Sequence, residues 1–261
     1  MIEIALLNRS TVVADGTLDV ITAALNDQLK NDFGPADAWG IEANITFVPR
    51  GAPDPVDSWW VAVFDNADVA NALGYHDVTS SGSPLGKVFA ATDLYYGTAL
   101  SVTVGHEVLE MLADPNIEHS VQVGDQLYRQ EICDAVEGDE FAYPIDVDGE
   151  EVLCTDFVLP AWFQPSLAPG STKFDFRNHC QRPLELLAGG YIQVKPLAGG
   201  SWTSMTASGA PDWRSRGMVG SRRERAMLPR EMWVTSSPEP PDRVAEIANR
   251  LMAADRSAAT G

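Results

Sequence analysis

Gly105-His106-Glu107-Val108-Leu109-Glu110 is the stretch of the sequence that decides the fold. The residues around its polar positions are apolar, and the pattern predicts a helix over residues 98–112, which Pro115 terminates. Because an α-helix has 3.6 residues per turn, His106 and Glu110 project from the same face about one turn apart. A helix with so many apolar residues is expected to be buried, where unpaired carboxylates are costly. The stretch therefore predicts a buried helix whose carboxylates need partners.

His106, Glu107 and Glu110 have the spacing of a metal-binding helix. Two ligands four residues apart can hold one ion, and Glu107 can reach a water on that ion without being a ligand. This is the logic of the helical His-Glu-x-x-His motif, in which two histidines hold zinc and the glutamate is the general base. Here Glu110 replaces the second histidine, which makes the site more anionic and harder. We predict zinc at this site, with manganese or calcium admissible; the alternative is a helix with these residues on a solvated or salt-bridged face.

Three acidic residues compete to be the third ligand. Glu131 is the first candidate and Asp134 the second, while Asp114 lies one turn beyond Glu110 but precedes the proline that ends the helix. The alternative for residues 130–134 is a solvated acidic loop. His76 is a further catalytic candidate, because an imidazole can donate to a developing oxyanion or position a ligand; the alternative is a loop histidine with ordinary partners.

The remaining pattern predicts an α+β fold. Apolar or alternating runs predict strands over residues 2–7, 43–49, 59–64 and 85–91. The apolar face from Val20 to Leu29 predicts a helix that ends near Phe33, and residues 74–77 lead into a loop. The order up to Pro115 is strand, helix, strand, strand, strand, helix. We predict three regions: a sheet with the motif helix over 1–115, mixed strands and loops that complete a cleft over 116–237, and a linker, a terminal helix and a frayed tail over 238–261.

The charge of the chain excludes two classes of partner. Its 18 basic and 37 acidic residues give a formal net charge of −19. Binding to nucleic acid or to an anionic membrane depends on Lys and Arg, which release counterions from the partner. We therefore expect neither nucleic acid nor a membrane as a principal partner. The sequence leaves the oligomeric state open.

The sequence also predicts a cytoplasmic protein. Its apolar runs are shorter than the about 20 residues that cross a bilayer, and its N-terminus lacks a basic leader and a long apolar stretch. Cys133, Cys154 and Cys180 are an odd number at wide spacing, which predicts reduced thiols rather than a disulfide framework or a cysteine-based zinc site. Association with a virion, or release by a non-classical route, is the alternative location.

The run Val104 to Glu110 resembles the motif helix of the zincin superfamily of metallopeptidases, with the second histidine changed. The order of elements over residues 1–115 is also similar to the N-terminal half of that superfamily. The resemblance implies a twisted mixed sheet packed on two helices, with the motif on the second helix. It implies His106 and Glu110 as ligands and Glu107 as general base. It also implies an edge strand, for which residues 85–91 are the candidate, that pairs with an extended peptide substrate.

Two further runs, His106 to Pro115 and Phe157 to Phe163, resemble a group of uncharacterised bacterial and phage proteins. That group supplies no activity to carry over. We predict a metal-dependent peptidase that hydrolyses a peptide or protein substrate with metal-activated water. The alternative is a non-catalytic structural or interaction protein, such as a virion or assembly component or an inactive relative, in which the metal or the carboxylate network supports the fold.

Overall fold

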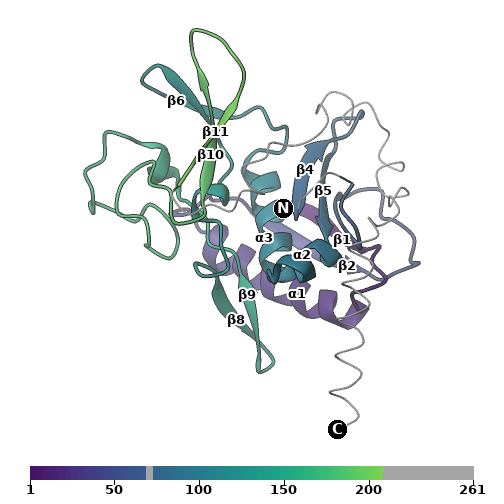
Figure 1. Cartoon of the computed structure of the whole chain (residues 1–261). Helices are drawn as coiled ribbons and strands as arrows, with labels where there is room; N and C mark the ends of the chain where they lie inside the picture. Colours follow the sequence, from purple (N-terminus) through teal and green to yellow (C-terminus); the bar gives the residue numbers. More distant parts are fainter. Residues whose placement is uncertain (69–72, 208–261) are drawn as a thin grey trace.

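A five-stranded mixed sheet forms the centre of the N-terminal part of the molecule (Figure 1). The computed structural model describes residues 1–68 and 73–207. The strand order is β2-β1-β3-β5-β4; neighbouring strands are parallel except β4 and β5, which are antiparallel. The strands are β1 (Ile2–Asn8), β2 (Ala43–Val48), β3 (Trp59–Phe64), β4 (Gly74–Val78) and β5 (Pro84–Phe89).

Two long helices cover one face of this sheet. They are α1 (Asp15–Gln28) and α3 (Leu100–Ala113). The chain continues directly from α1 into a short π-helix, η1 (Leu29–Phe33). Side chains alternate along each strand, so Ile4 and Leu6 of β1 join the core beneath the helices, while Ala5 and Leu7 belong to a second apolar cluster on the opposite face. The sheet is therefore apolar on both faces, as its strand sequences predict.

Much of the predicted order of elements is confirmed. The strands over residues 2–7, 43–49 and 59–64 are β1, β2 and β3, and the first helical stretch ends at Phe33 as expected. The motif helix covers 100–113, close to the predicted 98–112. The mixed α+β class is confirmed as well.

The prediction that residues 85–91 form the edge strand is wrong. β5 lies inside the sheet between β3 and β4, and β4 is the edge strand. Residues 74–77 were expected to lead into a loop, but they form β4, with His76 opposite Gly86. Gly and Asp are turn-forming residues, so the local sequence does not show that antiparallel pairing with β5 makes this segment a strand.

The motif helix is also not the second helix. A short helix, α2 (Ala90–Tyr96), follows β5 directly and ends at Gly97, whose φ of 71° is in the left-handed region. Seven residues are too few to show a helical period in the sequence. The predicted strand over 85–91 therefore ends at Phe89, and its last two residues begin this helix.

The rest of the described chain consists of short strands and irregular segments, as predicted. One sheet has the order β11-β10-β7-β6, and β8 and β9 form a separate hairpin. These elements are β6 (Ser120–Val123), β7 (Gln126–Arg129), η2 (Asp134–Val136), β8 (Tyr143–Val147), β9 (Glu150–Cys154), η3 (Pro160–Phe163), β10 (Tyr191–Pro196) and β11 (Thr203–Thr206).

This second half shares the main core with the sheet and helices. Buried side chains such as Phe157 and Trp162 belong to the same apolar cluster as Leu25 of α1 and Val108 of α3. The linker, terminal helix and tail predicted over 238–261 lie outside the described residues. Within the described residues, no helix has the length and apolar character needed to cross a membrane.

Candidate metal centre

Two imidazoles and four carboxylates from three segments of the chain meet beside α3. The helix supplies His106, Glu107 and Glu110, and strand β4 supplies His76. Glu131 comes from the segment between β7 and η2, and Asp134 is the first residue of η2. We call this set the His–carboxylate cluster: His76, His106, Glu107, Glu110, Glu131 and Asp134.

The first side of the cluster is centred on His106. Its Nε2 lies 3.2 Å from Oε2 of Glu110, one turn along α3, and 3.3 Å from Oδ1 of Asp134. The Sγ atom of Cys133 lies within 4.8 Å of donor atoms of His106 and Glu110. The predicted convergence of His106 and Glu110 with a third donor is therefore present in the structure.

The second side is centred on His76, which is only 5% exposed. Its Nδ1 lies 3.5 Å from Oε2 of Glu107 and 3.7 Å from Oε2 of Glu110, and its Nε2 lies 3.6 Å from Oε2 of Glu131. None of the described residues forms a hydrogen bond with this buried Nε2. Glu110 therefore presents the same oxygen, Oε2, to both histidines.

Burial and mutual charge shift the pKa values of the cluster. Burial alone lowers the pKa of His76, but the negative charges of Glu131, Glu107 and Glu110 outweigh it and raise the pKa to about 9. The pKa of His106 is raised well above its usual value because Glu110 and Asp134 outweigh its burial. Burial raises the pKa of Asp134 to about 7, and the charge of Glu110 adds to this. Without a cation, the cluster therefore retains protons that exposed groups would lose at neutral pH.

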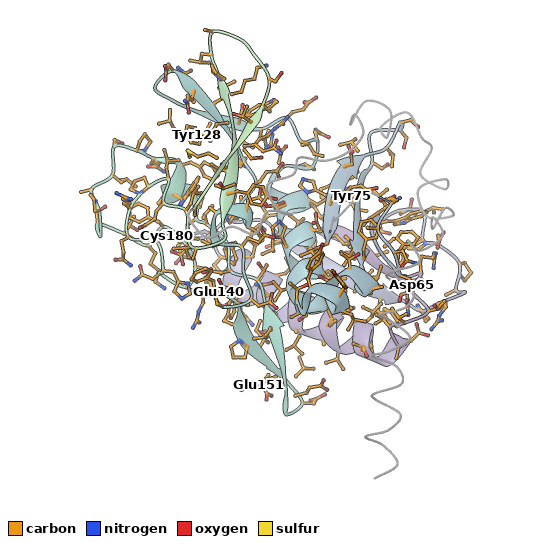
Figure 2. The ribbon with its side chains drawn as sticks, in the orientation of Figure 1. Asp65, Tyr75, Tyr128, Glu140, Glu151 and Cys180 are labelled. Carbon is orange, nitrogen blue, oxygen red and sulfur yellow. The ribbon has the colours of Figure 1, made fainter. Side chains whose placement is uncertain are left out.

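Two glycines let Glu107 lie against the sheet. A Cβ atom at Gly74 of β4 would meet Oε1 of Glu107 at 2.6 Å, and one at Gly86 of β5 would lie 3.7 Å from the Glu107 Cβ. Any larger side chain at position 74 would occupy the space that the carboxylate fills. The close approach of α3 to these strands thus fixes Glu107 next to His76 (Figure 2 shows the packed side chains around α3).

The backbone around η2 fixes the other carboxylates. The backbone N–H of Cys133 donates to Oε1 of Glu110 over 3.1 Å, which leaves Oε2 to face the histidines. Gly190 packs on η2 so closely that a Cβ there would lie 2.4 Å from the carbonyl oxygen of Ala135. Tyr191 lies beside Asp134, and burial followed by nearby carboxylate charge raises the pKa of this phenol well above its usual value. Its hydroxyl therefore stays protonated and can donate to Asp134.

The spacing of the donor atoms suits a bound cation. Bonds of zinc to nitrogen and oxygen are about 2.0–2.2 Å, so the ligands of a tetrahedral ion lie about 3.3–3.6 Å from one another. The distances around His106 and His76 are 3.2 to 3.7 Å. In two groups of three residues, each residue offers one ligand atom, and these atoms lie within 4.8 Å of one another. The groups are His106 with Glu110 and Cys133, and His76 with Glu110 and Glu131.

The sequence-predicted residues have different positions relative to these groups. Glu131, the first candidate for third ligand, lies beside His76, whereas Asp134, the second candidate, lies beside His106. Asp114 is buried elsewhere, at the end of α3, where its carboxylate accepts the backbone N–H groups of Glu118 and His119. Its position therefore explains its role as a helix-ending residue.

Cys133 was missed as a possible donor because the cysteine spacing argued against cysteine ligands. All three cysteines are buried and free of disulfide bonds, as predicted. The one signal in the sequence was the position of Cys133 next to Asp134, within the stretch that already contained the candidate third ligands.

A second group of donors lies away from the cluster. His179, in the irregular segment after η3, has its Nδ1 3.1 Å from Oδ2 of Asp156, and the carboxylate of Asp175 lies close by. Both carboxylates already accept backbone N–H groups, among them those of Phe157 and Cys180. Burial and the neighbouring Asp175 raise the pKa of Asp156 to about 9. A protonated Asp156 can lie beside the Asp175 carboxylate without charge repulsion. We therefore interpret this group as a structural contact that holds the irregular segment together.

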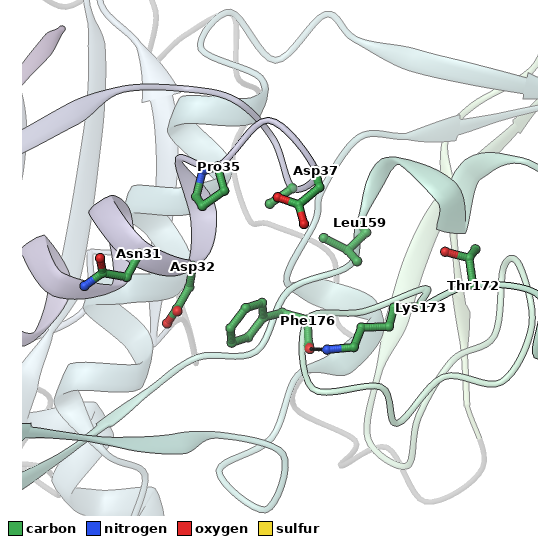
Figure 3. A pocket seen from close by; sticks show the side chains of 9 residues that line it. Asn31, Asp32, Pro35, Asp37, Leu159, Thr172, Lys173 and Phe176 are labelled. Carbon is green, nitrogen blue, oxygen red and sulfur yellow. Dashed lines mark hydrogen bonds between the residues drawn. The ribbon is translucent and has the colours of Figure 1, made fainter.

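A separate pocket of 280 Å³ opens between the end of α1 and the irregular segment (Figure 3). One wall includes Asp32 and Pro35, and the other includes Leu159, Lys173 and Phe176. Lys173 Nζ donates across 3.5 Å to the carbonyl oxygen of Phe176. No residue of the His–carboxylate cluster lines this pocket.

Comparison with models of protein families, with curated proteins and with solved structures gave no match in any of the three.

Proposed function

We propose that this protein is a metal-dependent peptidase whose cation is held by the His–carboxylate cluster. The observation that carries the proposal is the convergence of His106, Glu110 and further carboxylates in a buried site with more negative than positive groups. A buried carboxylate is stable only when it is paired or binds a metal. Zinc suits two histidines with carboxylates, and manganese or calcium suits the oxygen-rich side. The mixed sheet with α1 and α3 on one face supports the resemblance to zincins.

The cation would supply a Lewis acid that polarises the scissile carbonyl and lowers the pKa of a water. Glu107 is then the residue that accepts the proton of the attacking water. Its carboxylate faces His76 from α3, with Oε2 at 3.5 Å from Nδ1 of that histidine. Glu107 can therefore take up a proton and pass it to the leaving amine.

Strand β4 supports a peptide as the substrate. It is the edge of the sheet, and His76 lies at its centre. An extended peptide that adds to an edge strand forms main-chain hydrogen bonds and is read by side-chain pockets along its length. A peptide paired with β4 would pass beside the cluster, which links the place of binding to the place of the proposed chemistry.

A structural role for the metal is the second candidate, and the burial of the cluster favours it. Glu107, Glu110 and Glu131 are each at most 5% exposed. Structural metal sites are closed by protein ligands, whereas catalytic sites keep one position open. In this role the ion would hold β4, α3 and η2 together without hydrolysis, as in an assembly component or an inactive relative.

The experiment that tests the proposal combines metal analysis with cleavage of a mixed peptide library. We expect bound zinc in the purified protein, and cleavage that falls by at least about 100-fold in Glu107→Gln while the bound metal is unchanged, because the variant lacks only the proton acceptor. Glu118→Gln makes the same change at an exposed position after α3 and should cleave like the wild type. Metal without any cleavage would support the structural role, and protein that binds no metal would refute both.

A further inference from the structure

The His–carboxylate cluster contains more donors than one ion needs. A tetrahedral zinc site uses four ligands, and a catalytic site only three from the protein. The cluster offers two imidazoles and four carboxylates, with Cys133 Sγ beside them; without Glu107, the proposed proton acceptor, it still offers six donors. In carboxylate-rich bundle proteins, two histidines and four carboxylates are the donors for a pair of iron or manganese ions. The donor set is thus the size that two ions require.

The donors also fall into two groups in space. His106 lies with Asp134 and Cys133, and His76 lies with Glu131. Glu110 is common to both groups, and its Oε2 faces His106 Nε2 at 3.2 Å and His76 Nδ1 at 3.7 Å. Because Oε1 of the same residue accepts the Cys133 N–H, the orientation of this carboxylate is fixed. Glu110 has the position of a bridging ligand.

Two observations point to a second ion on the His76 side. The Nε2 atom of His76 is buried and forms no hydrogen bond with the described residues, although it lies 3.6 Å from Glu131. A buried imidazole nitrogen of this kind is costly unless it has a partner. In addition, when both histidines are neutral, as metal ligands are, one divalent cation balances only two of the four carboxylate charges, whereas two divalent cations balance all four.

We infer that the cluster binds two divalent cations, one beside His106 and Asp134 and one beside His76 and Glu131, bridged by Glu110. The inference rests on the proposed metal-dependent function and extends it from one ion to two. Pairs of ions in hydrolytic enzymes lie about 3.5–4 Å apart and hold the attacking and leaving oxygens between them. A two-ion centre also gives His76 a defined role as a ligand of the second ion.

The first test is the stoichiometry of the full-length protein. The protein is stripped with a chelator, titrated with Zn²⁺, desalted and analysed for bound metal. We expect two zinc ions per chain in the wild type and one in His76→Gln. One zinc ion in the wild type would overturn the inference but leave the proposed single-metal function intact. Protein that binds no zinc would overturn both.

The second ion must also be located, because Asp156, Asp175 and His179 form another group of donors. His179→Gln is the matched control: if it retains two ions, the pair lies in the cluster. If it loses one ion while His76→Gln keeps two, the second ion lies at Asp156 and His179, and the inference is wrong.

Electron paramagnetic resonance of the wild type loaded with Mn²⁺ gives the same information without a variant, in case His76→Gln does not fold. A pair bridged by Glu110 gives the spectrum of two exchange-coupled ions. Two signals of isolated ions would overturn the inference.

Discussion

Asp93 of α2 is a buried carboxylate in which only one of the two oxygens accepts side-chain hydrogen bonds. Its Oδ1 accepts the hydroxyls of Thr98 and Thr103, while Oδ2 has no hydrogen-bond partner among the described residues. Burial raises the pKa of Asp93 to about 7, against the effect of the two threonines. The native state therefore retains a proton that the unfolded chain loses near pH 4, so this residue lowers the stability as the pH rises from 4 to 7.

Asp93→Asn removes that charge and keeps an oxygen for both threonines. We expect it to be more stable than the wild type at pH 8, by up to about 4 kcal/mol for a shift of three pH units. At pH 4 the two proteins should have similar stability. Urea unfolding across this range measures the difference. Asp19→Asn makes the same change at an exposed site of α1 and should follow the wild type; parallel curves for Asp93→Asn and the wild type would contradict the assignment.

Tyr191 is a residue that we expect to orient the proposed metal ligand Asp134 without binding the metal itself. Its protonated hydroxyl lies beside Asp134 and can donate to that carboxylate, which lies 3.3 Å from Nε2 of His106. Hydrogen bonds of this kind orient metal ligands, and their loss weakens metal binding by about 10–100-fold. We expect Tyr191→Phe to raise the Kd for Zn²⁺ by this factor in a competition titration. Tyr95→Phe, at an exposed position of α2, is the control; equal affinities for the two variants would show that the hydroxyl has no such role.

At the scale of elements, the contact between Gly190 and η2 holds Asp134 in place. Gly190→Ala would bring a Cβ within 2.4 Å of the Ala135 carbonyl oxygen, a backbone atom that cannot rotate away. We expect the variant to displace η2, to lose about 1–3 kcal/mol of stability as overpacked sites do, and to bind zinc more weakly. Chemical unfolding and zinc titration measure both effects. Gly16→Ala has open space around its Cβ within α1 and should be neutral or stabilising.

The same scale shows what the sequence could and could not predict. Strand β3 was predicted with its observed bounds because a run of six consecutive apolar residues is typical of a buried strand. The stacking of His106 and Glu110 followed from the helical repeat, which is local. Strand β4 was missed because its pairing with β5 is set by the sheet and not by its own residues. Which carboxylate lies beside which histidine depends on the path of the twenty residues between α3 and η2, and no local pattern encodes that path.

At the scale of the whole molecule, the His–carboxylate cluster joins parts of the chain that are distant in sequence. His76 belongs to the five-stranded sheet, Glu110 to α3, and Asp134 to the second half of the chain. A ligand that binds only the folded state stabilises it by about 2.7 kcal/mol at 100 times its Kd. For a chain of this size we expect zinc at that excess to raise the Tm of the chelated protein by about 5–10 °C.

Scanning calorimetry with and without Zn²⁺ measures this shift, and the choice of variants shows where it arises. Glu110→Gln removes the carboxylate that both histidines face, so its Tm should respond little to zinc. Glu118→Gln keeps the cluster intact and should show the full increase. The stabilisation is linked to folding because the donors come together only when the sheet, α3 and η2 are assembled. An equal rise in Tm for both variants would show that the bound zinc lies outside the cluster. Metal binding would then not be linked to the assembly of the two halves.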